Sequence, residues 1–337
     1  MCCAPAIWKQ AVAAQRLDEF ERIARFFAPL AAPGALGLRD DVALIDGPAG
    51  QQYVLKTDAI VEGVHFFADD PPGQVAQKLL RVNLSDLAAK GAVPVGYLLV
   101  TALPRTRDEA WLEAFAGGLA RDQARYGIAL LGGDSTATDG PATLSITAVG
   151  RVAAGRAVLR SGARSGDLVY VSGTLGDAAL GLQVLRGELR DIDAGAQAFL
   201  ADRYRLPQPR LAFGQRLVGI ARAMTDISDG LVADLGHIAD VSEVGAVIEA
   251  ARLPLSPAAR AAIAADPLRL AAALGGGDDY ELLFTAPAAA DAALAALAGE
   301  LGVALSMIGR IEAGSGVSVV DEKGAVLAVP VAGYRHF

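Results

Sequence analysis

The sequence predicts an α/β (α+β) protein built from two domains. Its 337 residues are too many for one small domain and suit two domains of ordinary size. Hydrophobic residues make up 53% of the chain, which is enough to bury a large core and too many for a disordered chain. Short apolar runs typical of strands alternate along the chain with amphipathic segments typical of helices.

The alternation is interrupted over residues 153–166. This segment is rich in Gly, Ala and Arg and shows neither helical nor strand periodicity. We therefore expect the domain boundary near residue 155, with one domain over residues 1–154 and the other over residues 155–337.

In the first half, an amphipathic helix is expected over residues 9–27, before a loop that contains Pro33, Gly34 and Gly37. Two further helices are expected over residues 74–90 and 108–127, where apolar side chains recur with helical period. Strands are expected over five short apolar runs, at residues 42–46, 52–58, 97–103, 128–133 and 143–152.

The second half repeats the alternation with different lengths. Strands are expected over residues 168–173 and 281–286 and near the C-terminus, and a strand ends just before residue 226. Helices are expected over residues 176–187, in the region up to residue 222, and over residues 230–240 and 288–300. The Ala-rich segment 257–298 is expected to be mainly helical, because Ala favours helices and Leu recurs through it.

Two of these elements orient polar side chains. In the helix over residues 74–90, Asp86 and Lys90 share the face beside the leucine stripe. In the strand over residues 52–58, side chains alternate, so Lys56 and Asp58 lie on the face opposite to Thr57.

The composition argues against several classes of partner. The chain has 38 acidic and 30 basic residues and a net charge of -8, whereas non-specific nucleic-acid binding needs clustered Lys and Arg. No apolar run reaches the ~18 residues of a membrane span, and the first residues lack the features of a signal peptide. The adjacent Cys2 and Cys3 make a poor disulfide pair. We expect a cytoplasmic protein that binds neither nucleic acid nor membrane.

Several familiar catalytic motifs are absent from the sequence. The dipeptide Gly-Lys does not occur, which excludes a Walker A loop, and there is no His-Arg-Asp loop of the protein-kinase type. The three histidines (His65, His237 and His336) are far apart in sequence, so a histidine-based zinc site is not expected.

Aspartates stand instead at the ends of many predicted elements. Each has an ordinary explanation when it is taken alone. Asp229 precedes a helix and is a candidate N-cap. Asp86 is four residues from Lys90 and is a candidate for a solvated helix pair. Asp134 and Asp278 follow glycines and are candidate turn residues.

Taken together, the aspartates point to metal binding. Carboxylates that converge beside apolar strands repel one another unless cations lie between them. A site rich in oxygen and poor in nitrogen and sulfur suits a hard cation, above all Mg²⁺. Mg²⁺ usually binds through one or two carboxylates and the phosphates of a substrate. The sequence therefore predicts Mg-nucleotide chemistry.

Eight motifs occur in an order that resembles the thiamine-monophosphate kinase family over nearly the whole chain: DDVAL, KTDAIVEGVHF, NLSDLAAKGAVP, LLGGDST, LRSGARSGD, TDISDGLVADLGHIA, GGDDYELLFT and GYRHF. The resemblance implies the two-domain fold of aminoimidazole ribonucleotide synthetase. It implies an N-terminal sheet domain that forms a homodimer and a C-terminal α/β domain that completes the active site. It also implies phosphorylation of thiamine monophosphate to thiamine diphosphate by ATP, with several Mg²⁺ ions.

The same resemblance implies roles for individual residues. The positions that match Mg²⁺ ligands are Asp41, Thr57, Asp58, Asp86, Asp134, Asp226 and Asp229. Those that match ATP contacts are Gly133, Asp134, Arg160 and Ser228, and those that match substrate contacts are His65, Asp278 and Tyr334. No general base is expected, because the accepting phosphate has a second pKa of ~6 and is largely ionised at neutral pH.

The sequence departs from the family pattern at three of these motifs. Arg39 replaces a glycine, Asp278 stands where Glu is common, and Lys56 replaces a Ser or Thr. The ammonium of Lys56 is expected either to replace one metal contact or to bind phosphate directly. Two rival functions remain open at this point. One is another enzyme of the same fold, such as selenophosphate or aminoimidazole ribonucleotide synthetase, and the other is a metal-binding scaffold without turnover.

Overall fold

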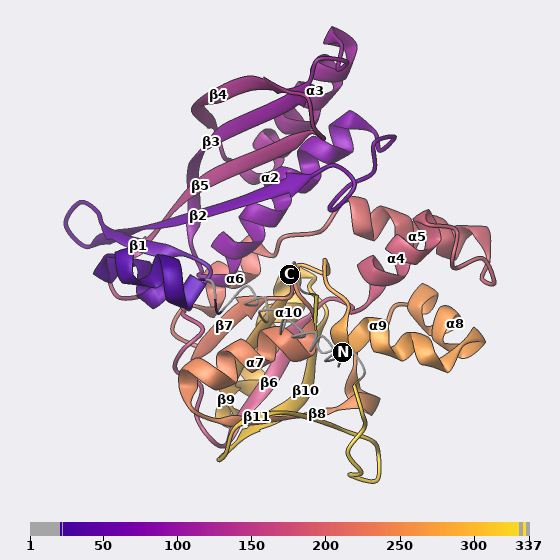
Figure 1. Cartoon of the computed structure of the whole chain (residues 1–337). Coiled ribbons are helices and arrows are strands. Elements are labelled where there is room, and N and C mark those ends of the chain that lie inside the picture. The colour runs from indigo at the N-terminus through magenta and orange to yellow at the C-terminus, as the bar shows by residue number, and fades with distance from the viewer. Residues whose placement is uncertain (1–20, 22, 330–332, 335–337) are drawn as a thin grey trace, which may run out of the picture.

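The computed structural model describes residues 21, 23–329 and 333–334, and it contains two β-sheets, one from each half of the chain (Figure 1). The five-stranded sheet comes from residues 43–153 and the six-stranded sheet from residues 167–320. The expected two-domain α/β arrangement is confirmed. The exact boundary near residue 155 stays a prediction.

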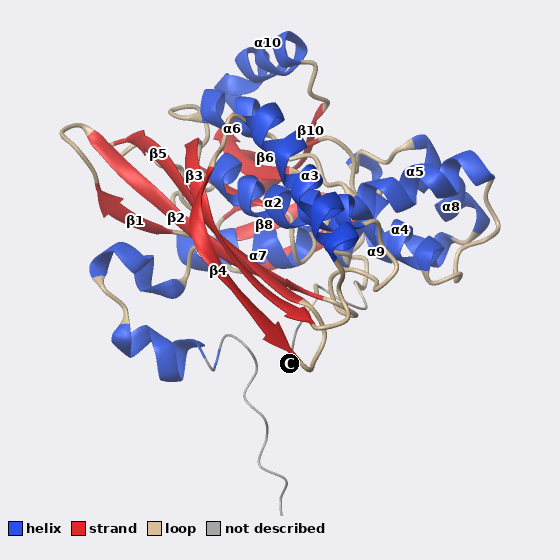
Figure 2. Ribbon diagram, turned by 90° about the horizontal axis from the view of Figure 1, so that it is seen from above, coloured by secondary structure: helices blue, strands red, loops and turns tan. Residues whose placement is uncertain are grey.

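The first sheet has the strand order β1-β2-β5-β3-β4. Neighbours are antiparallel except β3 and β4, which are parallel. Two long helices, α2 and α3, pack against each other, and α2 covers β2 and β5 (Figure 2). The elements are β1 Ala43–Asp46, β2 Gln51–Val61, α2 Pro72–Ala89, β3 Val93–Pro104, α3 Glu109–Tyr126, β4 Leu130–Thr138 and β5 Thr143–Ala153.

The second sheet has the order β11-β8-β10-β6-β9-β7, in which only β11 and β8 are parallel. Helix α7 packs against β7, β8 and β11, and helices α4, α5, α8 and α9 form a group at one side (Figure 2). The strands are β6 Asp167–Ser172, β7 Ala223–Asp226, β8 Gly245–Glu249, β9 Leu282–Pro287, β10 Leu305–Glu312 and β11 Gly316–Val320. The helices are α4 Asp177–Leu185, α5 Ala194–Arg205, α6 Leu211–Leu217, α7 Leu231–Ser242, α8 Pro257–Ala265, α9 Leu270–Gly275 and α10 Asp291–Leu301.

Helix α2 joins the two halves. It contacts β2 and β5 of the first sheet and β7 and β9 of the second, and it is buried along almost its whole length. Leu80, Leu84 and Leu87 are fully buried, as the leucine stripe predicts. Its polar side chains are buried as well: Asn83 accepts a hydrogen bond from the Asp58 backbone N–H at 3.0 Å. The polar face of α2 therefore faces the junction between the domains and not the solvent.

Some boundaries differ from those predicted. Strand β2 does not end at Asp58 but continues to Val61, because its ladder with β5 continues past the Asp58–Ile146 pair. Strand β4 likewise does not end at Gly133 but continues through Asp134, a candidate turn residue, to Thr138. In both cases pairing with a long neighbour overrides the weak strand preference of Asp and Gly.

Two further differences concern short elements. Strand β8 was not predicted, although Val and Ile recur in it. The expected helix over residues 9–27 falls largely outside the described residues, and Ile23–Phe27 forms one π-helical turn, η1. The other short turns are η2 Ala28–Leu30, η3 Pro33–Leu38, η4 Ala250–Arg252, η5 Pro267–Arg269 and η6 Ala288–Ala290. Within the described part of the chain, none of the helices is both long enough and apolar enough to cross a membrane.

Candidate active site

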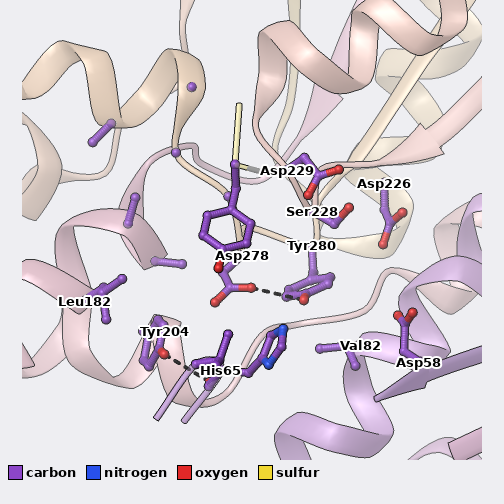
Figure 3. A pocket seen from close by; sticks show the side chains of 18 of the residues that line it. Asp58, His65, Val82, Leu182, Tyr204, Asp226, Ser228, Asp229, Asp278 and Tyr280 are labelled. Carbon is purple, nitrogen blue, oxygen red and sulfur yellow. Dashed lines mark hydrogen bonds between the residues drawn. The ribbon is translucent and has the colours of Figure 1, made fainter. Parts of the chain in front are cut away.

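A cavity of about 1110 Å³ lies between the two halves and is lined by residues of both (Figure 3). The first sheet and α2 line one side, and the loops that follow β7 and precede β9 line the other. Ten of the predicted site residues line it: Asp41, Asp58, His65, Asp86, Arg160, Asp226, Ser228, Asp229, Asp278 and Tyr334.

Three predicted residues, Thr57, Gly133 and Asp134, lie elsewhere. Thr57 points to the outer face of the first sheet, where its hydroxyl donates to the Ile146 carbonyl at 3.1 Å. Gly133 and Asp134 lie on the edge strand β4, which β5 and β3 separate from β2. Asp134 is thus an exposed strand residue and not a turn residue, and this chain alone does not bring it to the cavity.

One carboxylate cluster is formed by Asp41, Asp86 and Asp226. These residues come from the segment before β1, from α2 and from the end of β7, and one carboxylate oxygen of each lies within 4.8 Å of the others. They are 45 to 185 residues apart in sequence. The packing of α2 between the two sheets therefore assembles the cluster from both domains.

Buried cations hold Asp41 in its charged form. Lys90 Nζ, which is fully buried, lies 3.3 Å from a carboxylate oxygen of Asp41 and 3.0 Å from one of Asp40. The Arg160 guanidinium forms an ion pair with the other Asp41 oxygen. Burial alone would raise the pKa of Asp41, but Arg160 and then Lys90 outweigh it and hold this pKa well below its usual range. The suggested Asp86–Lys90 pair is therefore wrong, because Lys90 contacts Asp40 and Asp41.

Asp226 has a different environment. It is only 2% exposed, and its Oδ2 is buried without a hydrogen-bond partner among the described residues. Burial and the neighbouring Asp41 carboxylate raise the pKa of Asp226 to about 6. Burial also raises the pKa of Asp86 well above its usual value, although Lys56 opposes this. A buried carboxylate oxygen without a partner is costly unless a cation binds it, so this all-oxygen cluster fits Mg²⁺.

A second group of potential ligands lies at the start of α7. Ligand atoms of Asp229, Asp234 and His237 lie within 4.8 Å of one another. Asp234 Oδ2 accepts hydrogen bonds from the backbone N–H groups of Ser228, Asp229 and Gly230 at 3.0, 3.1 and 3.1 Å. It therefore fixes the turn that leads into α7, whose N-cap residue is Gly230 and which has no side-chain cap. The N-cap interpretation of Asp229 is wrong, and its side chain lines the cavity (Figure 3).

His237 is neutral in this environment. Burial and the nearby Arg160 charge lower the pKa of His237 to about 4. A neutral imidazole has one nitrogen that can accept a hydrogen bond or ligate a metal at neutral pH.

The opposite end of the cavity is lined by aromatic side chains around Asp278. Lys78 Nζ lies 2.9 Å from Asp278 Oδ2, and the Tyr280 hydroxyl donates to Asp278 Oδ1 at 3.1 Å. The Lys78 ammonium also lies 3.6 Å from the centre of the Tyr204 ring, whose hydroxyl donates to the His65 carbonyl at 3.0 Å. This end therefore offers flat rings and a carboxylate whose charge Lys78 partly balances.

The segment GGGDDYELL orients these groups by an unusual backbone. Asp278 and Tyr280 have positive φ values of 68° and 50°, a conformation that L residues rarely adopt. Backbone hydrogen bonds from Asp278 N to Ser228 O at 2.9 Å and from Tyr280 N to Ile227 O at 2.8 Å join the segment to TDISDG. The two motifs thus form one continuous wall of the cavity.

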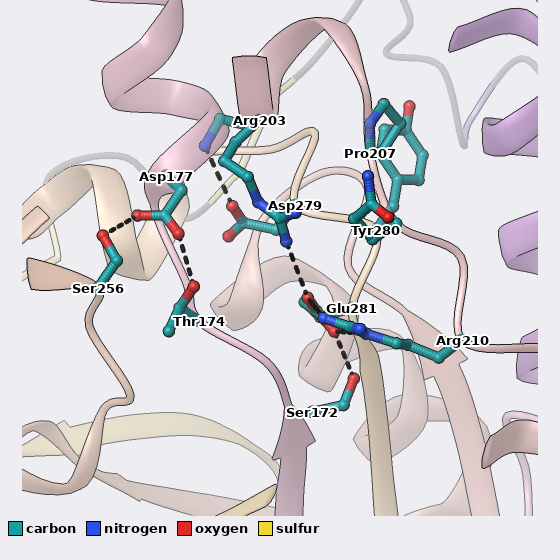
Figure 4. Close-up of polar contacts among 12 residues, drawn as sticks. Ser172, Thr174, Asp177, Arg203, Pro207, Arg210, Ser256, Asp279, Tyr280 and Glu281 are labelled. Carbon is teal, nitrogen blue, oxygen red and sulfur yellow. Dashed lines mark hydrogen bonds and ion pairs between the residues drawn. The ribbon is translucent and has the colours of Figure 1, made fainter. Parts of the chain in front are cut away.

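The alternate residues of this segment point into the C-terminal domain (Figure 4). Asp279 accepts hydrogen bonds from Gly176 N at 2.8 Å and Ala178 N at 3.4 Å, at the start of α4. Glu281, which is 1% exposed, accepts from Ser172 Oγ and from Arg210 Nε, both at 2.6 Å. These buried contacts hold the strained segment in place while Asp278 and Tyr280 face the cavity.

Comparison with known proteins places this geometry in a family. The AIR synthase related protein N-terminal domain matches residues 39–152 and the corresponding C-terminal domain matches residues 164–322. The thiamine-monophosphate kinase of Caulobacter vibrioides is 43% identical over 313 residues, which cover 91% of this chain and 88% of that protein. That of Escherichia coli K12 is 41% identical over 322 residues, covering 95% and 98%. The chain belongs to the thiamine-monophosphate kinase family.

A solved structure agrees with this membership of the thiamine-monophosphate kinase family. A structure described as AaThiL complexed with AMPPCP and TMP superimposes with a TM-score of 0.83 at 32% identity, covering 96% of this chain and 99% of that one. The expectation that the chain is a kinase of this family is confirmed. The other enzymes of the same fold, which we kept as rivals, are thereby set aside.

Sequence reasoning missed several residues that line or support the cavity. Lys78, Tyr204 and Tyr280 line or support the aromatic end, and Asp234 fixes the turn before α7. The partners of Lys78 and Tyr204 lie on other elements, up to 200 residues away in the case of Lys78 and Asp278. Asp234 had a local signal, since it follows Gly230 by one helical turn and could reach back to the turn before the helix.

Proposed function

We propose that this chain transfers the γ-phosphoryl group of ATP to thiamine monophosphate and forms thiamine diphosphate. The observation that carries the proposal is the single cavity with two unlike ends. One end holds buried carboxylates from both domains, including the unpaired Asp226 Oδ2, and the other holds Asp278 among aromatic rings. The family membership and the relative described with AMPPCP and TMP support the same pair of ligands.

Within this proposal, Asp41, Asp58, Asp86, Asp226 and Asp229 hold Mg²⁺. When bound there, Mg²⁺ would neutralise the phosphates and favour their in-line alignment. Arg160 and Ser228 line the same part of the cavity and are proposed to contact the phosphates of ATP. Because Arg160 already pairs with Asp41, its guanidinium is held in place before the nucleotide binds.

We propose direct transfer without a phosphoenzyme and without a general base. The accepting phosphate oxygen is largely ionised at neutral pH, so no residue has to remove a proton from it. The task of the chain is then to bind and align two anionic groups. A phosphorylated enzyme trapped by rapid quenching would contradict this step.

At the aromatic end, Asp278, His65 and Tyr334 are proposed to bind thiamine monophosphate. The thiazolium ring is a cation, and a tyrosine ring face attracts it by ~0.5–2 kcal/mol. The Asp278 carboxylate adds a negative charge or a hydrogen-bond acceptor for the aminopyrimidine. Lys78 and Tyr280 each contact one oxygen of this carboxylate and so fix its orientation.

The outer face of the first sheet supports a homodimer. Leu98, Val100 and Leu131 are large apolar residues that are 45%, 43% and 62% exposed in the single chain. Exposed apolar patches of this kind mark interaction surfaces. We propose that two copies pair through this face, and that Gly133 and Asp134 of one copy serve the nucleotide site of the other. We also propose a metal-binding role for Thr57, which lies on the same face.

We propose that the enzyme acts in the cytoplasm, where ATP and Mg²⁺ are available. The activity itself is tested by ADP release in a coupled assay with either thiamine monophosphate or thiamine as the acceptor. Release with the monophosphate alone is expected. Release with neither acceptor would support the remaining rival, a metal-binding scaffold without turnover.

A further inference from the structure

Lys56 places a fixed positive charge inside the carboxylate cluster. Strand alternation puts Lys56 and Asp58 on the cavity side of β2. Lys56 Nζ lies 3.2 Å from Asp58 Oδ1 and 3.2 Å from Asp86 Oδ2, and its side chain is only 13% exposed. It thus bridges two carboxylates that come from β2 and α2.

The charges around Lys56 show what this ammonium contributes. Lys56 contacts Asp58 and Asp86, and Lys90 and Arg160 contact Asp41. Asp40 contacts Lys90 as well, and Asp226 lies close enough to act on Lys56. Among these described residues, five carboxylates, counted in their ionised form, face three cations, which leaves two negative charges. Without Lys56 the excess would be three, and Asp86, which is 4% exposed, would lose the cation it contacts.

The alternative role for Lys56 is a direct contact with phosphate. Two of the three N–H donors of the ammonium already face carboxylates at 3.2 Å, so a move of the ammonium onto a phosphate would lengthen both ion pairs. Asp86 is fixed on a buried helix and cannot follow it. Moving the charge would leave Asp86 buried and unpaired, which is strongly unfavourable. The geometry therefore favours a role as a resident cation.

We propose that the Lys56 ammonium takes the place of one divalent cation between Asp58 and Asp86. The chain would then bind one Mg²⁺ fewer than the same chain with a neutral oxygen ligand at position 56. This inference rests on the proposed Mg²⁺-dependent function. It has a second consequence: Asp58 and Asp86 are held together before any metal binds, so this part of the site is pre-formed.

The test compares the wild-type chain with Lys56→Ser, which offers an oxygen ligand and no charge. The number of Mn²⁺ ions bound per chain is counted by electron paramagnetic resonance of free Mn²⁺, with a non-hydrolysable ATP analogue present. We expect one more Mn²⁺ in Lys56→Ser than in the wild type. The exposed Lys323→Ser serves as the matched control and should leave the number unchanged.

Thermal unfolding provides the second measurement. Lys56→Ser should melt at a lower temperature than the wild type in metal-free buffer. Adding Mg²⁺ should raise the melting temperature of the variant by more than it raises that of the wild type. A variant that is unfolded without metal and recovered by Mg²⁺ also supports the proposal, whereas a variant that no Mg²⁺ concentration stabilises contradicts it. Equal Mn²⁺ numbers above zero in both chains would overturn this inference alone. A wild type that binds no Mn²⁺ would overturn the Mg²⁺-dependent function and this inference with it.

Discussion

Replacing Glu281 by Gln removes a buried charge that supports the wall of the cavity. Glu281 is 1% exposed and receives hydrogen bonds from Arg210 Nε and Ser172 Oγ, both at 2.6 Å, with Arg203 3.5 Å away. Its own carbonyl accepts from Ile227 N at 3.0 Å, which joins it to TDISDG. The substitution keeps the shape of the side chain and removes its charge.

The expected loss of stability follows from these contacts. Hydrogen bonds to a charged group contribute about 1.5–3 kcal/mol, and breaking a buried ion pair costs about 3–5 kcal/mol. The Arg210 side chain is 22% exposed, so water can solvate part of the charge left behind. We therefore expect a loss of roughly 2–3 kcal/mol, toward the lower end of these ranges.

The assay is urea unfolding followed by fluorescence or circular dichroism. With a slope of about 3 kcal/mol per molar urea, the midpoint should fall by about 1 M. The control is Glu300→Gln, which removes the same kind of Arg–carboxylate contact at the surface, where Arg216 and Glu300 are 53% and 57% exposed. The control should leave the midpoint unchanged within error, because solvated ion pairs contribute little. Equal shifts in the two variants would show that the buried charge of Glu281 contributes no more than the exposed charge of Glu300.

Four further outcomes are expected. Asp226→Asn should lower turnover by orders of magnitude and abolish one Mn²⁺ site while the metal-free chain stays folded; wild-type turnover would contradict its metal role. Burial raises the pKa of Asp226 to about 6, so protons compete with metal for this carboxylate below that pH. The affinity of this site for Mn²⁺ should therefore fall about tenfold by pH 5, and an affinity that stays constant down to pH 5 would contradict metal binding by Asp226. Asp278→Ala should raise KM for thiamine monophosphate about tenfold with a smaller change in kcat, and an unchanged KM would remove it from the substrate site. Leu98→Asp with Val100→Asp should convert a dimer into monomers in sedimentation, and an intact dimer would exclude this face.

Much of the fold could be predicted because its signals are local. The leucine stripe of α2 and the alternation of β2 are set by neighbours within one or two turns, and both were found with nearly correct bounds. The continuation of β2 beyond Asp58 and of β4 beyond Gly133 could not be predicted, because it depends on pairing with β5 and β3. Such long-range pairing leaves no trace in a short window of sequence.

The same distinction applies to the site. The order of the aspartate motifs identified the family and most of the residues that line the cavity. The local partners that we considered for individual charges are not the ones that form. Lys90 contacts Asp40 and Asp41 and not Asp86 of its own helix, and the N-cap residue of α7 is Gly230 and not Asp229. Asp134 matched a family motif, yet its strand lies at the far edge of the sheet.

A crystal structure with Mn²⁺, a non-hydrolysable ATP analogue and thiamine monophosphate tests the metal site most directly. Asp41, Asp86 and Asp226 converge from both domains, and we expect them to bind metal at the site of phosphoryl transfer. Anomalous scattering should then show Mn²⁺ at roughly 2.2 Å from carboxylate oxygens of this cluster and from the analogue's phosphates, with the thiazolium ring near Asp278. Phosphates bound in the cavity with no metal peak at the cluster would contradict it.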